Sequence, residues 1–213
     1  MGMDTPSTLH LTYSAKSRRA LHLAERAHRG VNRRAGDHPY VLHPVVVAQI
    51  AAAVGADVDT ICACYLHDVP EDTGVTLADI VEEFGDRVAR FVAGVTKSRV
   101  GEDGHTLSHD EQAAQTEQKM GEDEIEVVVV KGCDLVANVT DLILDQRYEG
   151  YEHWCFLFGD RAEAKLSHYI RLGTILRDRL AAADAYPLLV EMLDERCGTL
   201  ARLLAAWPET PSA

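Results

Sequence analysis

The residues best suited to chemistry gather in one short segment, His67-Asp68-Val69-Pro70-Glu71-Asp72. If this segment is helical, Glu71 lies four residues from His67 and Asp72 lies four residues from Asp68, so the four side chains share one broad face. Three carboxylates so close together repel one another unless a cation lies among them. Imidazole and carboxylate ligands suit a divalent transition metal such as Mn²⁺, Zn²⁺ or Fe²⁺. A solvated acidic helix end is the alternative interpretation of the segment by itself.

Two further candidate ligands lie elsewhere in the chain. His43 precedes Pro44 at the start of an expected helix over 43–54, where proline suits the first turn. Asp134 belongs to a polar stripe on an otherwise apolar helix expected over 124–144, formed by Lys131, Asp134, Asn138 and Asp141. Burying a carboxylate is costly unless it is paired or binds a metal. Asp134 is therefore a candidate ligand, with a solvent-facing Lys131–Asp134 ion pair as the alternative.

The charge is unevenly distributed. The net charge is −13, which argues against DNA or RNA as a partner. Residues 16–34 nevertheless hold seven Lys or Arg side chains against a single acid, Glu25. Within this stretch Arg33 and Arg34 lie in an expected loop over 30–40, and arginine forks match phosphate oxygens. Lys97 adds a point charge, so the sequence predicts a small anionic ligand; a solvated helix face is the alternative for the other arginines.

The elements that must position these side chains are predicted to be helices. Apolar residues recur at spacings of three and four. Asp57 is expected to cap a helix through ICACYLHD that bends or ends at Pro70, and Thr76 with Asp79 forms a capping box for a short helix that Gly85 ends. The remaining helices are expected over 16–28, 43–54, 86–97, 108–119, 124–144, 160–182 and 187–205, with a loop over 98–106.

The segment 124–144 is ambiguous by itself. Its run IEVVVV favours a strand, because β-branched residues pack well in sheets. The apolar residues that follow have helical spacing, and no other segment of the chain offers a convincing partner strand. We therefore predict one long buried helix and an all-α fold, a helical bundle.

Composition sets broader bounds. The chain has 213 residues, 46% of them hydrophobic, enough for one domain with a sizeable core. It has no apolar run of about 18 residues and no secretory signal, so we expect no membrane partner. Its five cysteines include no CxxC pair, which favours a reducing, cytoplasmic location. The sequence leaves a homo-oligomer open.

Four motifs, in order along the chain, resemble a known family. AHRGVNRRAGDHPYVLHP, LHDVPEDT, FGDRVARFVAGVTK and VKGCDLVANVTDL are similar to the hydrolase domain of RelA/SpoT-type alarmone enzymes. The specific motifs cover about residues 16–145. The likeness continues weakly to about 205, as in the single-domain small alarmone hydrolases. It therefore implies one HD-type hydrolase domain over 1–213, with a motif-bearing core at 16–145 and C-terminal helices at 160–205.

The resemblance also implies roles for particular residues. It implies an all-helical HD domain that binds one Mn²⁺, although Fe²⁺ and Zn²⁺ suit the same ligands. The metal ligands matched by motif are His43, His67, Asp68 and Asp134. Glu71 and Asp72 match the catalytic acidic pair. The matched nucleotide-binding positions are Arg33, Arg34, Lys97, Asn138 and Tyr169. The implied reaction removes pyrophosphate from the 3′ position of guanosine tetra- or pentaphosphate, giving GDP or GTP.

Two other functions stay open from the sequence. One is an HD-type phosphohydrolase acting on another nucleotide, such as an NADPH phosphatase. The other is a nucleotide sensor without turnover, against which Glu71 and Asp72 argue, because a binding module has no need of two acids beside a bound anion.

Overall fold

The protein is described by a computed structural model over residues 14–33, 38–101 and 103–208. Within these ranges it consists of helices, and its only β-type contacts are two isolated bridges, Asn32 with Pro39 and Val100 with Thr106. The predicted all-α fold is confirmed. None of the helices in the described ranges has the length and apolar character that a membrane crossing requires.

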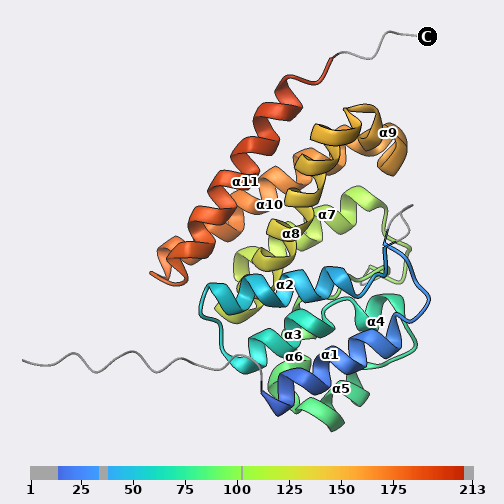
Figure 1. Ribbon diagram of the computed structural model, residues 1–213, viewed down its shortest axis with the longest axis vertical. Coiled ribbons are helices and arrows are strands. Elements are labelled where there is room, and N and C mark those ends of the chain that lie inside the picture. Colours follow the sequence, from blue (N-terminus) through green and yellow to red (C-terminus); the bar gives the residue numbers. More distant parts are fainter. Residues whose placement is uncertain (1–13, 34–37, 102, 209–213) are drawn as a thin grey trace, which may run out of the picture.

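The helices form two groups on either side of α8 (Ile125–Glu149), which packs against members of both. Figure 1 shows the first group in blue to green in the lower half and the second in yellow-green to red above it. The first group contains α1 (Ala15–Ala27), α2 (Leu42–Ala53), α3 (Val58–Leu66), α4 (Val69–Asp72), α5 (Leu77–Phe84) and α6 (Asp86–Val95). The second contains α7 (His109–Glu122), α9 (Glu152–Phe158), a 3₁₀ turn (Gly159–Arg161), α10 (Ala162–Ala182) and α11 (Pro187–Ala205).

Short polar motifs fix where several helices begin. The Asp57 side chain accepts a hydrogen bond from the Thr60 backbone N–H at 2.8 Å and caps α3. Thr76 and Asp79 form the predicted capping box of α5. Gly85, with φ of 86°, then ends α5 and begins α6, a backbone conformation that favours glycine. These starts and stops agree with the sequence-based expectations.

The ambiguous valine run is helical. Val127 to Val130 are all fully buried within α8, because neighbouring helices cover this helix on several sides. A run that is apolar all round suits such a central helix as well as it suits a strand. Burial among helices, with no strand in the described ranges to pair with, decides the outcome.

The main local departure from expectation lies around the HDVPED segment. The helix that carries it ends at Leu66, and Pro70 lies in the first turn of a separate short helix, α4. The predicted break is therefore present, but His67, Asp68, Glu71 and Asp72 do not share one continuous helical face. A second departure is α9, which the sequence did not predict; buried Trp154 anchors it, with its indole N–H donating to the Leu142 carbonyl at 2.9 Å.

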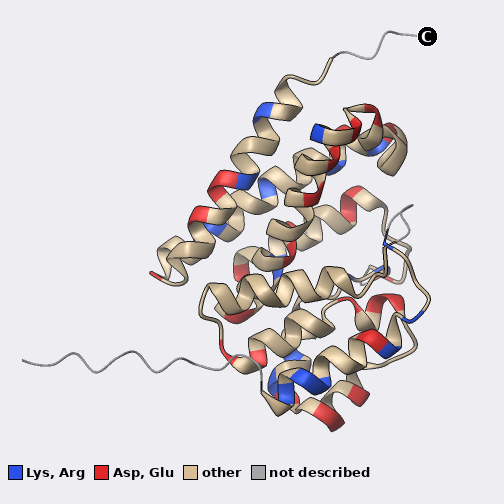
Figure 2. Ribbon diagram, in the orientation of Figure 1, with Lys and Arg blue, Asp and Glu red and all other residues tan. Residues whose placement is uncertain are grey.

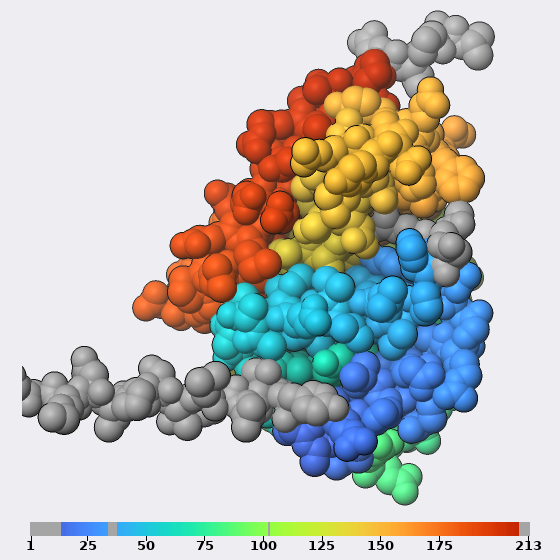
Figure 3. All heavy atoms as spheres, viewed as in Figure 1, coloured from blue at the N-terminus to red at the C-terminus, as the bar shows by residue number. Residues whose placement is uncertain are grey.

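The surface shows how α2 lies within the bundle. In the space-filling view α2 (cyan) forms a band between α1 (blue) and the C-terminal half of α8 (yellow) (Figure 3). Basic residues lie along α1, as the charge distribution predicts, and acidic residues lie on nearby α4 and α5 (Figure 2). The first turn of α2 therefore lies where the two groups of helices meet, which is where His43 projects inward.

Candidate metal centre

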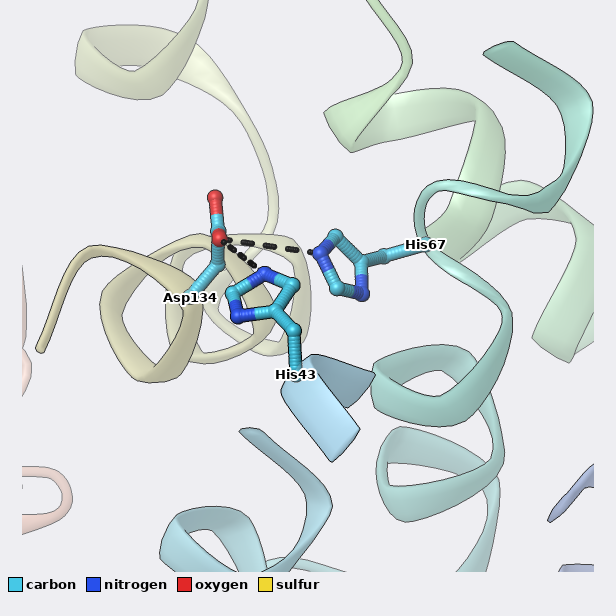
Figure 4. Close-up of side chains that lie close together, drawn as sticks. All are labelled: His43, His67 and Asp134. Atoms are coloured by element: carbon cyan, nitrogen blue, oxygen red, sulfur yellow. Dashed lines mark hydrogen bonds and ion pairs between the residues drawn. The ribbon is translucent and has the colours of Figure 1, made fainter. Parts of the chain in front are cut away.

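Three side chains from three distant parts of the chain converge inside the bundle. His43 comes from the first turn of α2, His67 directly follows α3, and Asp134 lies in the middle of α8 (Figure 4). Nε2 of His43 lies 3.2 Å and Nε2 of His67 3.6 Å from Oδ1 of Asp134. The potential ligand atoms all lie within 4.8 Å of one another, and all three residues are buried. This geometry is suited to one metal ion.

The hydrogen bonding of His67 fits a metal ligand. Its Nδ1 donates to the Cys64 carbonyl at 2.8 Å, which leaves Nε2 to face the cluster. That Nε2 is buried and makes no hydrogen bond of acceptable geometry with any described residue. Its 3.0 Å contact with Oδ2 of Asp68 is a charge contact only. Because buried polar atoms are rarely left unpartnered, an unpartnered nitrogen aimed at carboxylates fits a position that a cation fills.

Asp68 lies at the edge of the cluster. Its Oδ2 is 3.0 Å from Nε2 of His67 and 3.7 Å from Nε2 of His43. The same oxygen accepts a hydrogen bond from the Tyr40 hydroxyl at 2.7 Å. The Asp68 side chain is 18% exposed, whereas those of the two histidines are 3% exposed. The fourth predicted ligand is therefore beside the other three and is the least enclosed.

Asp134 is held by neighbours one turn away on each side along α8. Lys131 donates to its Oδ2 at 2.9 Å, and the Asn138 amide donates to its Oδ1 at 2.5 Å. Burial alone would raise the pKa of Asp134, but the Lys131 ammonium and the two histidines hold it well below its usual value. Burial likewise disfavours the charged form of Lys131, and Asp134 outweighs it and raises the lysine pKa. The Lys131–Asp134 ion pair offered as the alternative is present, but it is buried and lies beside the histidines.

The two histidines differ in electrostatics. Burial lowers the pKa of His43, and the Asp134 carboxylate only partly offsets it. Burial also opposes the charge on His67, but Asp68 and Asp134 outweigh it and raise the pKa to about 10. A metal ion binds neutral imidazole and ionised carboxylate, so it competes with the proton on His67.

The two predicted catalytic acids lie beside the cluster rather than in it. Glu71 and Asp72 line an open cavity of 490 Å³. One Glu71 oxygen accepts the Lys97 backbone N–H at 2.7 Å, and Lys97 Nζ lies 3.8 Å from the other. The cavity is also lined by the cations Lys97, Arg99, Arg161 and Lys165.

This basic cavity adjoins the metal cluster. An inner cavity of 130 Å³ is lined by His43, Asp68 and Asp134 and shares the side chains of Lys97, Lys165 and His168 with the basic cavity. Arg99, Arg161 and Lys165 form no ion pair with a residue in the described ranges. Their positive charge is therefore available to an anion that reaches the cluster.

The predicted nucleotide-binding residues fall in different places. One terminal nitrogen of Arg33, Nη2, donates to Asn138 and to Asp141, each at 2.9 Å. Asn138, Lys97 and Tyr169 line the inner cavity together with Arg33. Arg34 lies outside the described residues.

Sequence reasoning missed several residues at the site. Tyr40 is part of the PYVLHP motif, and that position was the available signal. Lys165, Arg161 and His168 lie near or on α10, whose helical pattern gave no such indication; Lys165 Nζ lies 4.6 Å from the centre of the Tyr169 ring. His168 is buried, and its Nδ1 lies 2.7 Å from Glu117 of α7. Only the packing of α10 against α7 and α8 brings these residues to the site.

The chain belongs to the HD domain family, whose profile matches residues 20–149. Membership implies a divalent metal ion, and the buried histidine and carboxylate ligands fit one.

Curated relatives point to one branch of this family. The chain is 51% identical over 79 residues to a probable GTP pyrophosphokinase of Mycobacterium leprae, a match covering 37% of this chain and 10% of that protein. It is 35% identical over 127 residues to a guanosine-3′,5′-bis(diphosphate) 3′-pyrophosphohydrolase of Borreliella burgdorferi, covering 58% and 18% respectively. These matches confirm the resemblance to RelA/SpoT-type hydrolase domains. The chain spans only a small part of the length of these relatives.

Solved structures share the fold over most of the chain. One is a metazoan SpoT ortholog that hydrolyses ppGpp, with a TM-score of 0.67 and 23% identity, covering 88% of this chain and 98% of that one. Another is a Listeria monocytogenes protein, with a TM-score of 0.63 and 26% identity, covering 76% and 99%. The helical arrangement therefore recurs in chains of similar extent.

Proposed function

We propose that this protein is a metal-dependent hydrolase that removes pyrophosphate from the 3′ position of guanosine tetra- or pentaphosphate, giving GDP or GTP. The observation that carries the proposal is the joining of two features, a buried His/Asp cluster and a cavity lined by four cations. A 3′-diphosphate needs both a metal centre and several cations around it. The names of the Borreliella burgdorferi relative and of the metazoan structural neighbour support the same substrate.

His43, His67, Asp68 and Asp134 would hold the ion, with Mn²⁺ as the proposed metal. Such an ion supplies Lewis-acid stabilisation of phosphate oxygens and activates water. The protein would supply the fixed geometry, because the ligands come from three packed regions: α2, the junction of α3 with α4, and α8. His67 is held in one tautomer by the Cys64 carbonyl.

The two acids beside the cluster, Glu71 and Asp72, would act as general base and general acid. As the oxygen of water bonds to the phosphorus next to the ribose, the bond from that phosphorus to the ribose 3′ oxygen breaks. The electron pair of that bond stays on the 3′ oxygen, which must gain a proton as the water loses one. Glu71, whose carboxylate accepts a hydrogen bond from the Lys97 backbone N–H, and its neighbour Asp72 would accept and return that proton.

The cations of the basic cavity balance the charge of the diphosphate. Lys97, Arg99, Arg161 and Lys165 would neutralise charge on the phosphate oxygens during attack. Asn138 and Tyr169 would contact the ribose or a phosphate from the wall of the inner cavity. Arg33 is better suited to shaping that wall, because Asn138 and Asp141 hold its guanidinium; Arg34 remains a proposed phosphate contact.

Further proposals concern the domain organisation, the cellular location and the partners of the protein. We propose one HD-type unit over 1–213, with the core at 16–145 and C-terminal helices at 160–205, acting in the cytoplasm in the stringent response. All five cysteines are free, which supports a reducing compartment. The net charge of −13 supports a small nucleotide rather than DNA or RNA as partner. A homo-oligomer is compatible with these proposals.

The test is release of pyrophosphate and orthophosphate from guanosine tetraphosphate and NADPH, side by side, with Mn²⁺ and with EDTA. Pyrophosphate from the alarmone, abolished by EDTA and by Asp68→Ala, is the expected result. Release of orthophosphate from NADPH, with no product from guanosine tetraphosphate, would contradict the proposed substrate but not the proposed metal centre. No product from either nucleotide would favour a sensor without turnover.

A further inference from the structure

Asp68 has a partner outside the set of metal ligands. Its Oδ2, the oxygen nearest both histidines, accepts a hydrogen bond from the Tyr40 hydroxyl at 2.7 Å. A carboxylate at the edge of a cluster can rotate away from it unless something fixes its plane. The Tyr40 hydroxyl is the neutral donor that does so here.

Tyr40 is itself held in place. Its backbone N–H donates to the Val31 carbonyl at 2.8 Å. Its ring stacks on the His28 ring, with centroids 4.6 Å apart and planes 23° from parallel. The Tyr40 ring also makes a T-shaped contact with the His43 ring, with centroids 6.2 Å apart. Because these contacts fix both the backbone and the ring, the hydroxyl has little freedom to leave Asp68.

His28 is held in a fixed position and supports the Tyr40 ring. It is 3% exposed, and its Nδ1 lies 3.0 Å from the Ala24 carbonyl one turn back at the end of α1. The chain of contacts therefore runs from α1 through the His28 ring and the Tyr40 ring to the Asp68 carboxylate. These contacts connect α1 with the edge of the metal cluster.

We propose that Tyr40 is a positioning residue of the metal centre, whose hydroxyl holds the Asp68 carboxylate in its ligating orientation while His28 supports the ring. This inference rests on the proposed metal centre but not on the identity of the substrate. Partners that orient metal ligands typically contribute about 10- to 100-fold in metal affinity or activity. Since Tyr40 acts through Asp68, its removal weakens metal binding before any nucleotide is present.

The test is the affinity for Mn²⁺ alone, measured from the electron paramagnetic resonance signal of free Mn²⁺ in titrations without nucleotide. Tyr40→Phe removes the hydroxyl and keeps the ring stack on His28. Tyr151→Phe is the matched control, because Tyr151 also stacks on an aromatic ring, that of Trp207, and its hydroxyl makes no hydrogen bond with a residue in the described ranges. Circular dichroism and melting in EDTA establish that each variant is folded.

The expected result is a dissociation constant for Mn²⁺ about 10- to 100-fold higher in Tyr40→Phe and unchanged in Tyr151→Phe. A Tyr40→Phe protein that is folded and binds Mn²⁺ within twofold of the unaltered protein would overturn the inference. Absence of Mn²⁺ binding to the unaltered protein would overturn the metal centre as well. Normal Mn²⁺ binding without turnover of guanosine tetraphosphate would refute only the proposed function.

Discussion

The buried Lys131–Asp134 pair provides a sharp test of whether a cation belongs in the cluster. Both side chains are 9% exposed, and the ammonium lies 2.9 Å from Oδ2. Lys131→Met keeps the length and apolar body of the side chain but leaves a buried carboxylate without its nearest positive charge. Breaking one partner of a buried pair typically costs about 3–5 kcal/mol. We expect Lys131→Met to lower the free energy of unfolding of the metal-free protein by about 3 kcal/mol, near the lower limit, because His67 and Asn138 still contact Asp134.

A bound metal should reduce that loss. The ion supplies positive charge to the same carboxylate, so we expect Lys131→Met to lose only about 1–2 kcal/mol when Mn²⁺ is saturating. By linkage, a difference of about 1.4 kcal/mol corresponds to tenfold tighter Mn²⁺ binding by the variant. The assay is urea unfolding in EDTA and in Mn²⁺, together with the Mn²⁺ dissociation constant.

Lys16→Met is the matched control. Lys16 also pairs with an aspartate, Asp59, but the side chains are 31% and 24% exposed, and Asp59 keeps its second partner Arg87. A partly exposed pair contributes little, so we expect a loss below about 1 kcal/mol that is the same in EDTA and in Mn²⁺. An equal loss for Lys131→Met in both conditions would refute the reasoning, since it would mean that no cation shares Asp134.

Three further predictions concern packing, pH and catalysis. A Cβ added at Gly173 of α10 would lie 2.3 Å from Sγ of Cys197, so Gly173→Ala should lose about 1–3 kcal/mol in urea unfolding. Gly198→Ala, whose nearest contact is at 3.8 Å, should instead gain about 0.5–1 kcal/mol; equal effects would contradict the close approach of α10 and α11. The raised pKa of His67 stabilises the metal-free protein fully below about pH 6.5, and this contribution should be lost as pH rises through about 10. Mn²⁺ binding at pH 7.5 should correspondingly release about one proton, seen by calorimetry in buffers of different ionisation enthalpy, and no release would count against His67 as a ligand. Glu71→Gln should keep Mn²⁺ affinity and lose most of the rate, about 10²-fold or more, and a near-normal rate would move the proton transfer to another group.

The elements that carry the metal ligands were predictable because local signals and burial agree. A capping residue predicted the start of α3, and a capping box and a glycine predicted the two ends of α5. Helical spacing after the valine run outweighed its strand preference. His43 and Asp134 are 91 residues apart in the chain. The motif resemblance predicted that both are metal ligands, and the packing of α2 against α8 brings them together. Periodicity alone could not have paired them.

Other features depend on packing that local patterns do not encode. The face that His67, Asp68, Glu71 and Asp72 would share on one helix does not form, because α3 ends at Leu66 and a new helix begins at Val69. In this new helix Glu71 contacts Lys97. The contact of Arg33 with phosphate stays a prediction; its contact with Asp141 of α8, through one terminal nitrogen, was not predicted. The cations Arg161 and Lys165 reach the site only because α10 packs beside α7. Such contacts between distant segments have no counterpart in residue spacing.

The most direct measurement of the central claim is the fate of guanosine tetraphosphate incubated with the Mn²⁺-loaded protein in ¹⁸O-labelled water, followed by mass spectrometry of the products. We expect GDP and pyrophosphate, with the label in pyrophosphate, because water attacks phosphorus and the 3′ oxygen leaves. We also expect EDTA to stop the reaction. Label in the nucleotide 3′ hydroxyl, release of orthophosphate alone, or turnover that persists in EDTA would contradict this expectation.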